Sequence, residues 1–251
     1  MREISRAVDK KLQVNNNLKA GKSMFFLNEV YHKLQNGIPC AIFDTEMNTR
    51  QWIERFLSLY SGISVHNIKN GIYTTSEKDK IFEGKEWLSR QPFAHLYEPE
   101  WTYEKIFTTA KILQRKIGLE FLVFDYIKAT STSSLQVKEH NFLGDMANYL
   151  KNNVAGKLNI AVLAGGQMSP KEQRLADSDK LNRYASVIAY WIKKSLGENC
   201  DGSKGTHKFF IEYNRLGRQF EEEEFIDMHF DGDHATIKQA KDGLQYVNAF
   251  E

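Results

Sequence analysis

Three residues near the N-terminus have the types and spacing of a phosphate-binding site. Gly21, Lys22 and Ser23 stand where a polar turn gives way to a helical pattern. At such a helix start, backbone N–H groups and the helix dipole attract phosphate, a lysine reaches the β- and γ-phosphates, and a serine hydroxyl ligates Mg²⁺. The pattern predicts binding of ATP with Mg²⁺, with Asn17 and Ala20 contributing further nucleotide contacts.

The phosphate-binding motif is incomplete in one place. The full pattern has a glycine five residues before Gly21, and this chain has Asn16. Asparagine is among the few residues that tolerate a left-handed backbone, so the run from Asn15 to Asn17 can still supply the turn. The alternative is an ordinary exposed helix start, where glycine and serine are common.

Polar residues also follow three later apolar segments, at the points where these would end as strands. Glu46, Asp125 and Gln167 stand at these positions. Hydrolysis of a bound nucleotide needs hard oxygen ligands for Mg²⁺ and a carboxylate that activates water. We therefore expect Ser23 and Asp125 to hold the metal, Glu46 to act on the water and Gln167 to sense the γ-phosphate. Taken singly, Glu46 and Asp125 are better explained as strand-end carboxylates facing water and Gln167 as a loop residue, and only their joint occurrence at successive strand ends favours hydrolysis.

These residues need a sheet that brings strand ends together. A short apolar segment beginning at Leu12 and further segments at 39–44, 93–97, 119–125 and 160–164 alternate with helical patterns, and 119–125 is apolar on both faces. This order predicts an α/β fold with a mostly parallel, doubly wound sheet, in which ligands bind at the carboxyl ends of strands. Segments 207–214, 224–230 and 234–238 alternate more strictly than the earlier ones and predict antiparallel hairpins at the sheet edge.

The helical pattern between the second and third apolar segments is weaker. Two polar helices are expected within 64–91, with Phe82, Trp87 and Leu88 as their apolar contacts.

Composition limits the classes of protein. The chain has 251 residues, a net charge of +2 and two distant cysteines, Cys40 and Cys200. So small a net charge does not by itself indicate a nucleic-acid or membrane partner. The spacing of the cysteines indicates neither a zinc site nor a disulfide framework. No signal peptide or membrane span is expected, and a reducing cytoplasm is the default location. We divide the chain into a short helix over 1–11 and one domain over 12–251.

The motifs taken in order resemble a known family. Over about 12–230 the chain is similar to the RecA-like ATPase domain of DnaB-family replicative DNA helicases, particularly phage-type members. The motifs that carry the resemblance are Gly21-Lys22-Ser23, Phe43-Asp44-Thr45-Glu46-Met47 with Arg55, Phe124-Asp125-Tyr126, Gln167, Ser178-Asp179 with 183–187, and Asn214-Arg215-Leu216-Gly217.

The resemblance implies a mechanism and partners. Lys22 and Ser23 would bind phosphate and Mg²⁺, Asp125 would be the Walker B acid, and Glu46 the catalytic base. Arg215 would be the finger that reaches the γ-phosphate of the adjacent subunit of a homohexameric ring, in the cytoplasm of a bacterial or phage-infected cell. A primase or loader would be a further partner, and 1–11 would correspond to a linker helix. The alternative for Arg215 is a solvated turn.

Single-stranded DNA is the partner that the family implies. Its channel loops correspond to 127–139 and 166–179, which carry Lys128, Lys138, Lys171 and Arg174. These cations would follow a phosphate backbone, or they are simply solvated lysines and arginine. The chain departs from the family in having Tyr213 where a lysine is usual.

Three functions remain open on the sequence. The first is an ATP-driven hexameric helicase. The second is a RecA-like single-strand-binding or regulatory ATPase that unwinds nothing. The third is an assembly module that does not hydrolyse ATP, to which the missing glycine at Asn16 would point.

Overall fold

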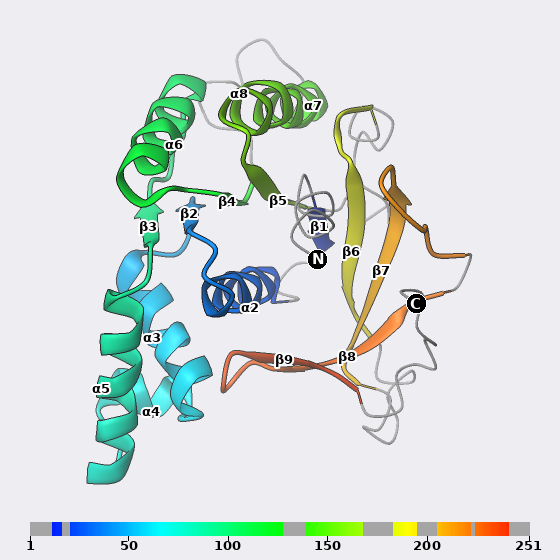
Figure 1. The fold of residues 1–251 in the computed structure, drawn as a ribbon. Coiled ribbons are helices and arrows are strands. Elements are labelled where there is room, and N and C mark those ends of the chain that lie inside the picture. Colours follow the sequence, from blue (N-terminus) through cyan, green and yellow to red (C-terminus); the bar gives the residue numbers. More distant parts are fainter. Residues whose placement is uncertain are drawn as a thin grey trace.

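The protein is built around one sheet (Figure 1). The computed structural model describes 12–16, 21–127, 139–167, 183–194, 205–221 and 224–240, with the backbone alone for 12–16, 139–143 and 167. Within these residues lies a nine-stranded sheet of order β3-β2-β4-β5-β1-β6-β7-β8-β9. Its strands are β1 Leu12–Asn16, β2 Cys40–Asp44, β3 Phe93–Tyr97, β4 Phe121–Asp125, β5 Ala161–Gln167, β6 Val187–Lys193, β7 His207–Asn214, β8 Ile226–Asp231 and β9 Thr236–Gln239.

The sheet changes from parallel to antiparallel along this order. Every pairing from β3 to β6 is parallel, and every pairing from β6 to β9 is antiparallel. The predicted doubly wound sheet with C-terminal antiparallel hairpins is therefore confirmed. The strongly apolar segment 119–125 supplies β4, which lies inside the sheet between β2 and β5.

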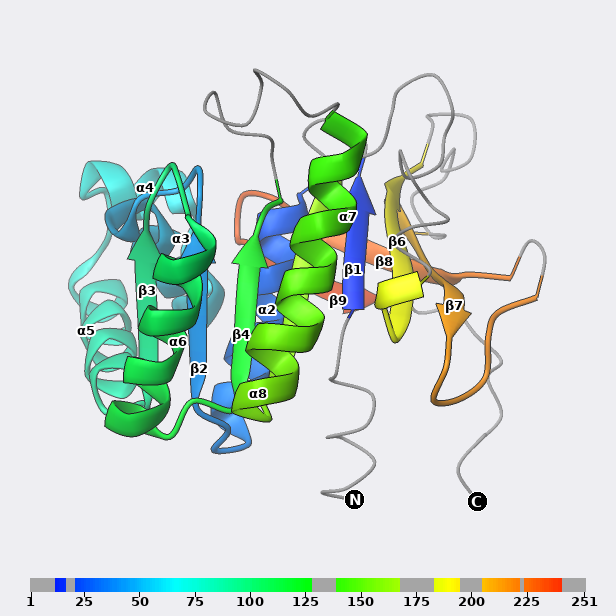
Figure 2. The same ribbon diagram turned by 90° about the horizontal axis from the view of Figure 1, so that it is seen from above.

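Helices cover both faces of the parallel part (Figures 1 and 2). One face carries α2 Lys22–Gln35, α3 Thr49–Ser61, α4 Val65–Asn70 and α5 Thr75–Ser89. The other carries α6 Tyr103–Ile117, α7 Glu139–Tyr149, the π-helix η1 Leu150–Ala155 and α8 Gly156–Leu158. Among the described helices, none is long and apolar enough to cross a membrane.

Alternating side chains of the central strands build two separate cores. On β2, Ile42 packs toward α2 and α3, whereas Phe43 packs toward α6. On β4, Val123 and Phe124 divide in the same way, and all four residues are buried. Because successive strand residues point to opposite faces, a strand apolar throughout is stable only when both faces are covered.

The contacts expected for α5 need one correction. Trp87 and Leu88 pack against the core, but Phe82 is 51% exposed, and Ile81 occupies the buried position instead. Only one narrow stripe of α5 faces α3, because α5 lies on the outside of the helical layer. Phe82 falls outside that stripe, between the ammonium groups of Lys78 and Lys85.

The last hairpin returns to the first described helix. Strands β8 and β9 pass beneath α2 in Figure 1. The side-chain amide of Asn28 on α2 donates to Ala235 O at 2.8 Å and accepts from Ile237 N at 3.2 Å. At the N-terminus of α2, the ring of Phe230 lies so close to Gly21 that a Cβ there would come within 2.8 Å of it. The C-terminal hairpin therefore holds both the start and the middle of α2.

Candidate active site

The carboxyl ends of four parallel strands meet at one edge of the sheet. Asp44 at the end of β2 and Asp125 at the end of β4 are register partners, and Thr45 N donates to Asp125 O at 2.8 Å. Gln167 at the end of β5 pairs with Asn16 at the end of β1. The predicted site residues at the ends of these strands therefore lie along the carboxyl-terminal side of the sheet.

Lys22 occupies the centre of this edge. It is the first residue of α2, and Gly21 before it has the left-handed φ of +84° that glycine adopts without strain. The Lys22 side chain is 10% exposed, and its Nζ lies 3.7 Å from Asp125 Oδ1 and 3.7 Å from the centre of the Tyr126 ring. Lys22 and Asp125 therefore lie together at the strand ends, and their roles in binding phosphate and Mg²⁺ stay predictions.

Gly165 on β5 makes room for the lysine. A Cβ at Gly165 would lie 2.9 Å from Lys22 Cδ and 2.9 Å from Phe26 Cζ. No role was predicted for this residue from the sequence, although a glycine inside an apolar strand indicates a close approach of another group. The absence of a side chain here lets the lysine stem lie against the strand.

Burial opposes the charges of both partners. The pKa of Lys22 is lowered by burial, against the attraction of Asp125 and Glu46. Burial raises the pKa of Asp125 to about 6, although the Lys22 charge and a hydrogen bond from the Ser23 hydroxyl act in the opposite direction. Asp44 and Glu46 raise the Asp125 pKa further. A charged ligand would therefore relieve an existing electrostatic cost.

The donor set fits Mg²⁺. Asp125 Oδ1 is buried and accepts no hydrogen bond from the described residues, and the Ser23 hydroxyl is bonded to the same carboxylate. These are hard oxygen ligands, and Mg²⁺ commonly takes one or two protein oxygens together with phosphate oxygens and water. No cluster of three or more acidic, histidine or cysteine side chains occurs among the described residues, so an all-protein metal cage is not built there.

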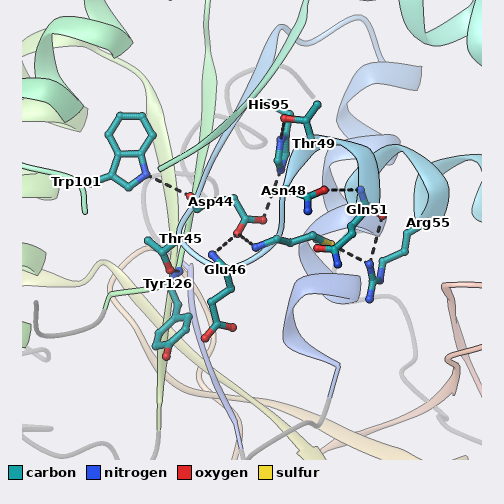
Figure 3. Close-up of polar contacts among 11 residues, drawn as sticks. Asp44, Thr45, Glu46, Asn48, Thr49, Gln51, Arg55, His95, Trp101 and Tyr126 are labelled. Atoms are coloured by element: carbon teal, nitrogen blue, oxygen red, sulfur yellow. Dashed lines mark hydrogen bonds and ion pairs between the residues drawn. The ribbon is translucent and has the colours of Figure 1, made fainter. Parts of the chain in front are cut away.

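Glu46 stands beside this pair. It follows the end of β2, its side chain is exposed, and its charge acts on both Lys22 and Asp125. In Figure 3, Glu46 and Tyr126 extend to the same side of the strand ends. No separate role was predicted for the buried Asp44. Its carboxylate accepts hydrogen bonds from the backbone N–H groups of Glu46 and Met47.

Arg215 is distant in sequence from these groups and forms hydrogen bonds with other residues of its own chain. It follows β7 and is exposed. Its Nε donates to the Tyr213 hydroxyl at 2.6 Å, and its Nη2 donates to Arg183 O at 3.0 Å. Tyr213 thus bonds directly to the guanidinium, a contact that was not predicted from the sequence.

Several predicted site residues lie outside the described part of the chain. These are Asn17, Ala20, Lys128, Lys138, Lys171 and Arg174, as well as the side chain of Gln167. The segments 1–11 and 178–179 lie outside it too.

A family model and individual related sequences point to the same protein family. A model of the DnaB-like helicase C terminal domain matches residues 14–238. A probable plasmid replicative DNA helicase of Chlamydia trachomatis serovar L2 is 24% identical over 173 residues, covering 65% of this chain and 38% of that protein. Replicative DNA helicase DnaB of Rickettsia bellii is 26% identical over 191 residues, covering 68% and 38%. The chain therefore spans less than half the length of these relatives.

Solved structures share the fold. An ATPase domain of known structure matches with a TM-score of 0.79 at 18% identity, over 93% of this chain and 85% of that one. A DnaB-like replicative helicase, solved with attention to its interactions with primase, gives 0.78 at 18% identity, over 92% and 57%. A KaiC-like protein of Pyrococcus horikoshii OT3 gives 0.61 at 12%, over 91% and 88%. These likenesses show a RecA-like fold.

Proposed function

Because the chain belongs to the family of DnaB-like helicase C-terminal domains, we propose that it is the motor domain of an ATP-dependent replicative DNA helicase. In this proposal it forms a ring, hydrolyses ATP at subunit interfaces and moves along single-stranded DNA. The observation that carries it is the buried pair of Lys22 and Asp125 at the end of the sheet, with Glu46 beside it. An ordinary solvated helix start would leave neither partner buried.

Each residue of the pair has a role that follows from its surroundings. Lys22 binds the β- and γ-phosphates with an ammonium already held by tertiary contacts. The Ser23 hydroxyl and the Asp125 carboxylate hold Mg²⁺, which when bound neutralises phosphate charge. Glu46 takes the proton of the attacking water, and its exposure leaves its carboxylate accessible to that water. Gln167 at the end of β5 senses the γ-phosphate through its amide.

The ring supplies the remaining cation. Arg215 is exposed and follows the end of β7, so a neighbouring subunit can meet it. A guanidinium that arrives only when the neighbour docks stabilises transition-state charge and links hydrolysis to subunit arrangement. We propose a homohexamer, with Lys128, Lys138, Lys171 and Arg174 following the DNA backbone and a primase or loader as a further partner.

ATP hydrolysis with and without single-stranded DNA tests the proposal. We expect the native protein to hydrolyse ATP faster when DNA is present, and Lys22→Ala to lose at least about a hundredfold in kcat/KM. Lys111→Ala is the matched control, because Lys111 is an exposed lysine of α6 and its loss should leave hydrolysis unchanged. A native protein without DNA-stimulated hydrolysis would rule the helicase out.

A second candidate is a RecA-like ATPase that binds single-stranded DNA or regulates a partner without unwinding. The favouring observation is that the Arg215 guanidinium bonds to Tyr213 and Arg183 of its own chain. Strand displacement separates the two, because this second protein would hydrolyse ATP and release no strand. Mixing Arg215→Ala with Glu46→Gln subunits tests the finger itself: partial recovery supports action on the neighbour, and simple dilution of activity contradicts it.

A further inference from the structure

Asp44 is a buried carboxylate with an unusual set of contacts. It ends β2 and is 1% exposed, so its charge needs compensation from nearby donors. Its Oδ1 accepts the backbone N–H of Glu46 at 2.8 Å and that of Met47 at 2.6 Å (Figure 3). One carboxylate oxygen therefore binds both peptide groups that define the backbone direction at Glu46.

The other oxygen of the same carboxylate accepts no hydrogen bond from the described residues and lies beside a buried histidine. Asp44 Oδ2 lies 3.5 Å from His95 Nε2, and the His95 side chain is 2% exposed. His95 Nδ1 lies 3.0 Å from Thr49 Oγ1. The Asp44 carbonyl oxygen accepts from Glu98 N at 2.9 Å and from Trp101 Nε1 at 3.4 Å. Neither the side chain nor the main chain of Asp44 can turn without breaking several of these contacts.

The turn is also tied to the neighbouring strand. Thr45 N donates to Asp125 O at 2.8 Å, and Tyr126 N donates to Thr45 Oγ1 at 3.4 Å. The backbone on both sides of Glu46 is therefore held, while the Glu46 side chain itself is exposed. The direction in which Glu46 points is set by its backbone, and Asp44 supplies the two bonds that fix this backbone.

We infer that Asp44 is the positioning residue of the hydrolytic site: its carboxylate holds the 46–47 backbone so that Glu46 faces the nucleotide bound by Lys22. The inference rests on the proposed ATP hydrolysis. Asp44 acts through hydrogen-bond acceptance, so its charge is dispensable and its acceptor oxygen is not. Because a displacement of about 1 Å at a reacting group can cost about a hundredfold in rate, this hold affects kcat and leaves nucleotide binding unchanged.

Three substitutions separate acceptance from charge. Asp44→Ala removes both acceptor bonds, and we expect kcat to fall about 10- to 100-fold with KM for ATP within about twofold of the native value. Asp44→Asn keeps an acceptor oxygen, and we expect kcat within about threefold of native. Asp44→Ser keeps a shorter acceptor and should give an intermediate kcat; it replaces the alanine variant if that variant does not fold.

Asn48→Ala is the matched control. The Asn48 side chain accepts the backbone N–H of Gln51 at 3.0 Å, which is the same kind of contact in the same loop. Its loss removes the cap of α3 and lowers the melting temperature, but it leaves the bonds to Glu46 and Met47 intact. We therefore expect kcat within about twofold of native for this variant.

A double-mutant cycle tests whether Asp44 acts through Glu46. In the Glu46→Gln background, Asp44→Ala should lower kcat no further, because the group that it positions is already disabled. A further loss as large as that in the native background would overturn the inference, as would an alanine variant whose KM rises while kcat stays native. An asparagine variant as impaired as the alanine variant would overturn it too.

Hydrogen exchange at the Glu46 and Met47 amides gives a readout independent of hydrolysis. Both amides should be protected in the native protein and in Asp44→Asn, and should exchange faster in Asp44→Ala or Asp44→Ser. If the native protein hydrolyses no ATP, the proposed function fails while these amides still decide whether Asp44 holds the turn. Unchanged exchange in the alanine and serine variants refutes the positioning role alone.

Discussion

Replacing Gly165 by alanine would place a methyl group between β5 and the stem of Lys22. The new Cβ would lie 2.9 Å from Lys22 Cδ and 2.9 Å from Phe26 Cζ, closer than carbon atoms pack. Phe26 is 1% exposed and enclosed in the core, so its ring cannot withdraw. The methyl group would therefore push β5 away from α2 as well as displace the lysine stem, and both changes alter the contact of the Lys22 ammonium with Asp125.

The cost of this change follows from two opposing effects. Overpacking a close contact costs about 1–3 kcal/mol, whereas removing a glycine from the unfolded chain returns about 0.5–1 kcal/mol. The net loss is up to about 2.5 kcal/mol, which for a protein of this size lowers the melting temperature by up to about 10 °C. Because Lys22 is displaced, the apparent affinity for ATP should fall about tenfold or more.

Gly84→Ala provides the matched control. Its Cβ would lie 2.9 Å from Tyr60 Cδ1 and 3.2 Å from Leu57 Cδ2, an equally close approach on α5. Alanine is favoured over glycine in a helix by about 1 kcal/mol, which offsets part of the overpacking. Thermal denaturation and ATP titration of both variants check the argument. If Gly165→Ala melts and binds ATP like the native protein, β5 does not confine Lys22 as described.

Three further outcomes are expected. The Asp125 carboxyl is protonated more readily in the folded chain, with a pKa of about 6 against 3.8 in a model peptide. Stability of the nucleotide-free protein should therefore rise by about 1–3 kcal/mol as pH falls from above 6 toward 3.8, and pH-dependent melting of Asp125→Asn should lack this rise. Asn28→Ala removes two hydrogen bonds to the last hairpin and should cost about 1–3 kcal/mol in urea unfolding, whereas the exposed Asn36→Ala should cost less than about 0.5 kcal/mol. Tyr213→Phe removes the hydroxyl bonded to Arg215 and should lower kcat about three- to tenfold at unchanged KM; a kcat equal to native would show that this bond does not orient the guanidinium.

The order of the strands and their polar ends was predictable because each signal is local. The segment 119–125 is apolar on both faces, which only a covered parallel strand satisfies, and it became β4 inside the sheet. The rule that ligands bind at the carboxyl ends of such strands predicted that Lys22 and Asp125 belong to one site. Local patterns failed at Phe82, because which stripe of α5 is buried depends on where α3 lies.

The finer parts of the site depend on contacts that spacing does not encode. Asp44 follows an apolar strand just as any solvated carboxylate would, and only the turn after it brings two N–H groups to one oxygen. His95 lies far along the chain and reaches Asp44 only because β2 and β3 pair in register. In the sequence, Tyr213 is only a departure from the lysine that is usual at this position. In the structure, its hydroxyl accepts a hydrogen bond from Arg215. Gly165 follows the apolar segment 160–164, and only the extension of β5 to Gln167 makes it a glycine within a strand, where it leaves room for Lys22.

The hold of the C-terminal hairpin on α2 has a mechanical consequence. Phe230 lies against Gly21 at the start of the helix, and Asn28 ties the helix to the β9 hairpin about two turns further on. Any displacement of Gly21 toward the hairpin therefore presses on the Phe230 ring. The last strands in the sheet order are thus joined directly to the first described helix, and this connection bypasses the strands that lie between them in the sheet.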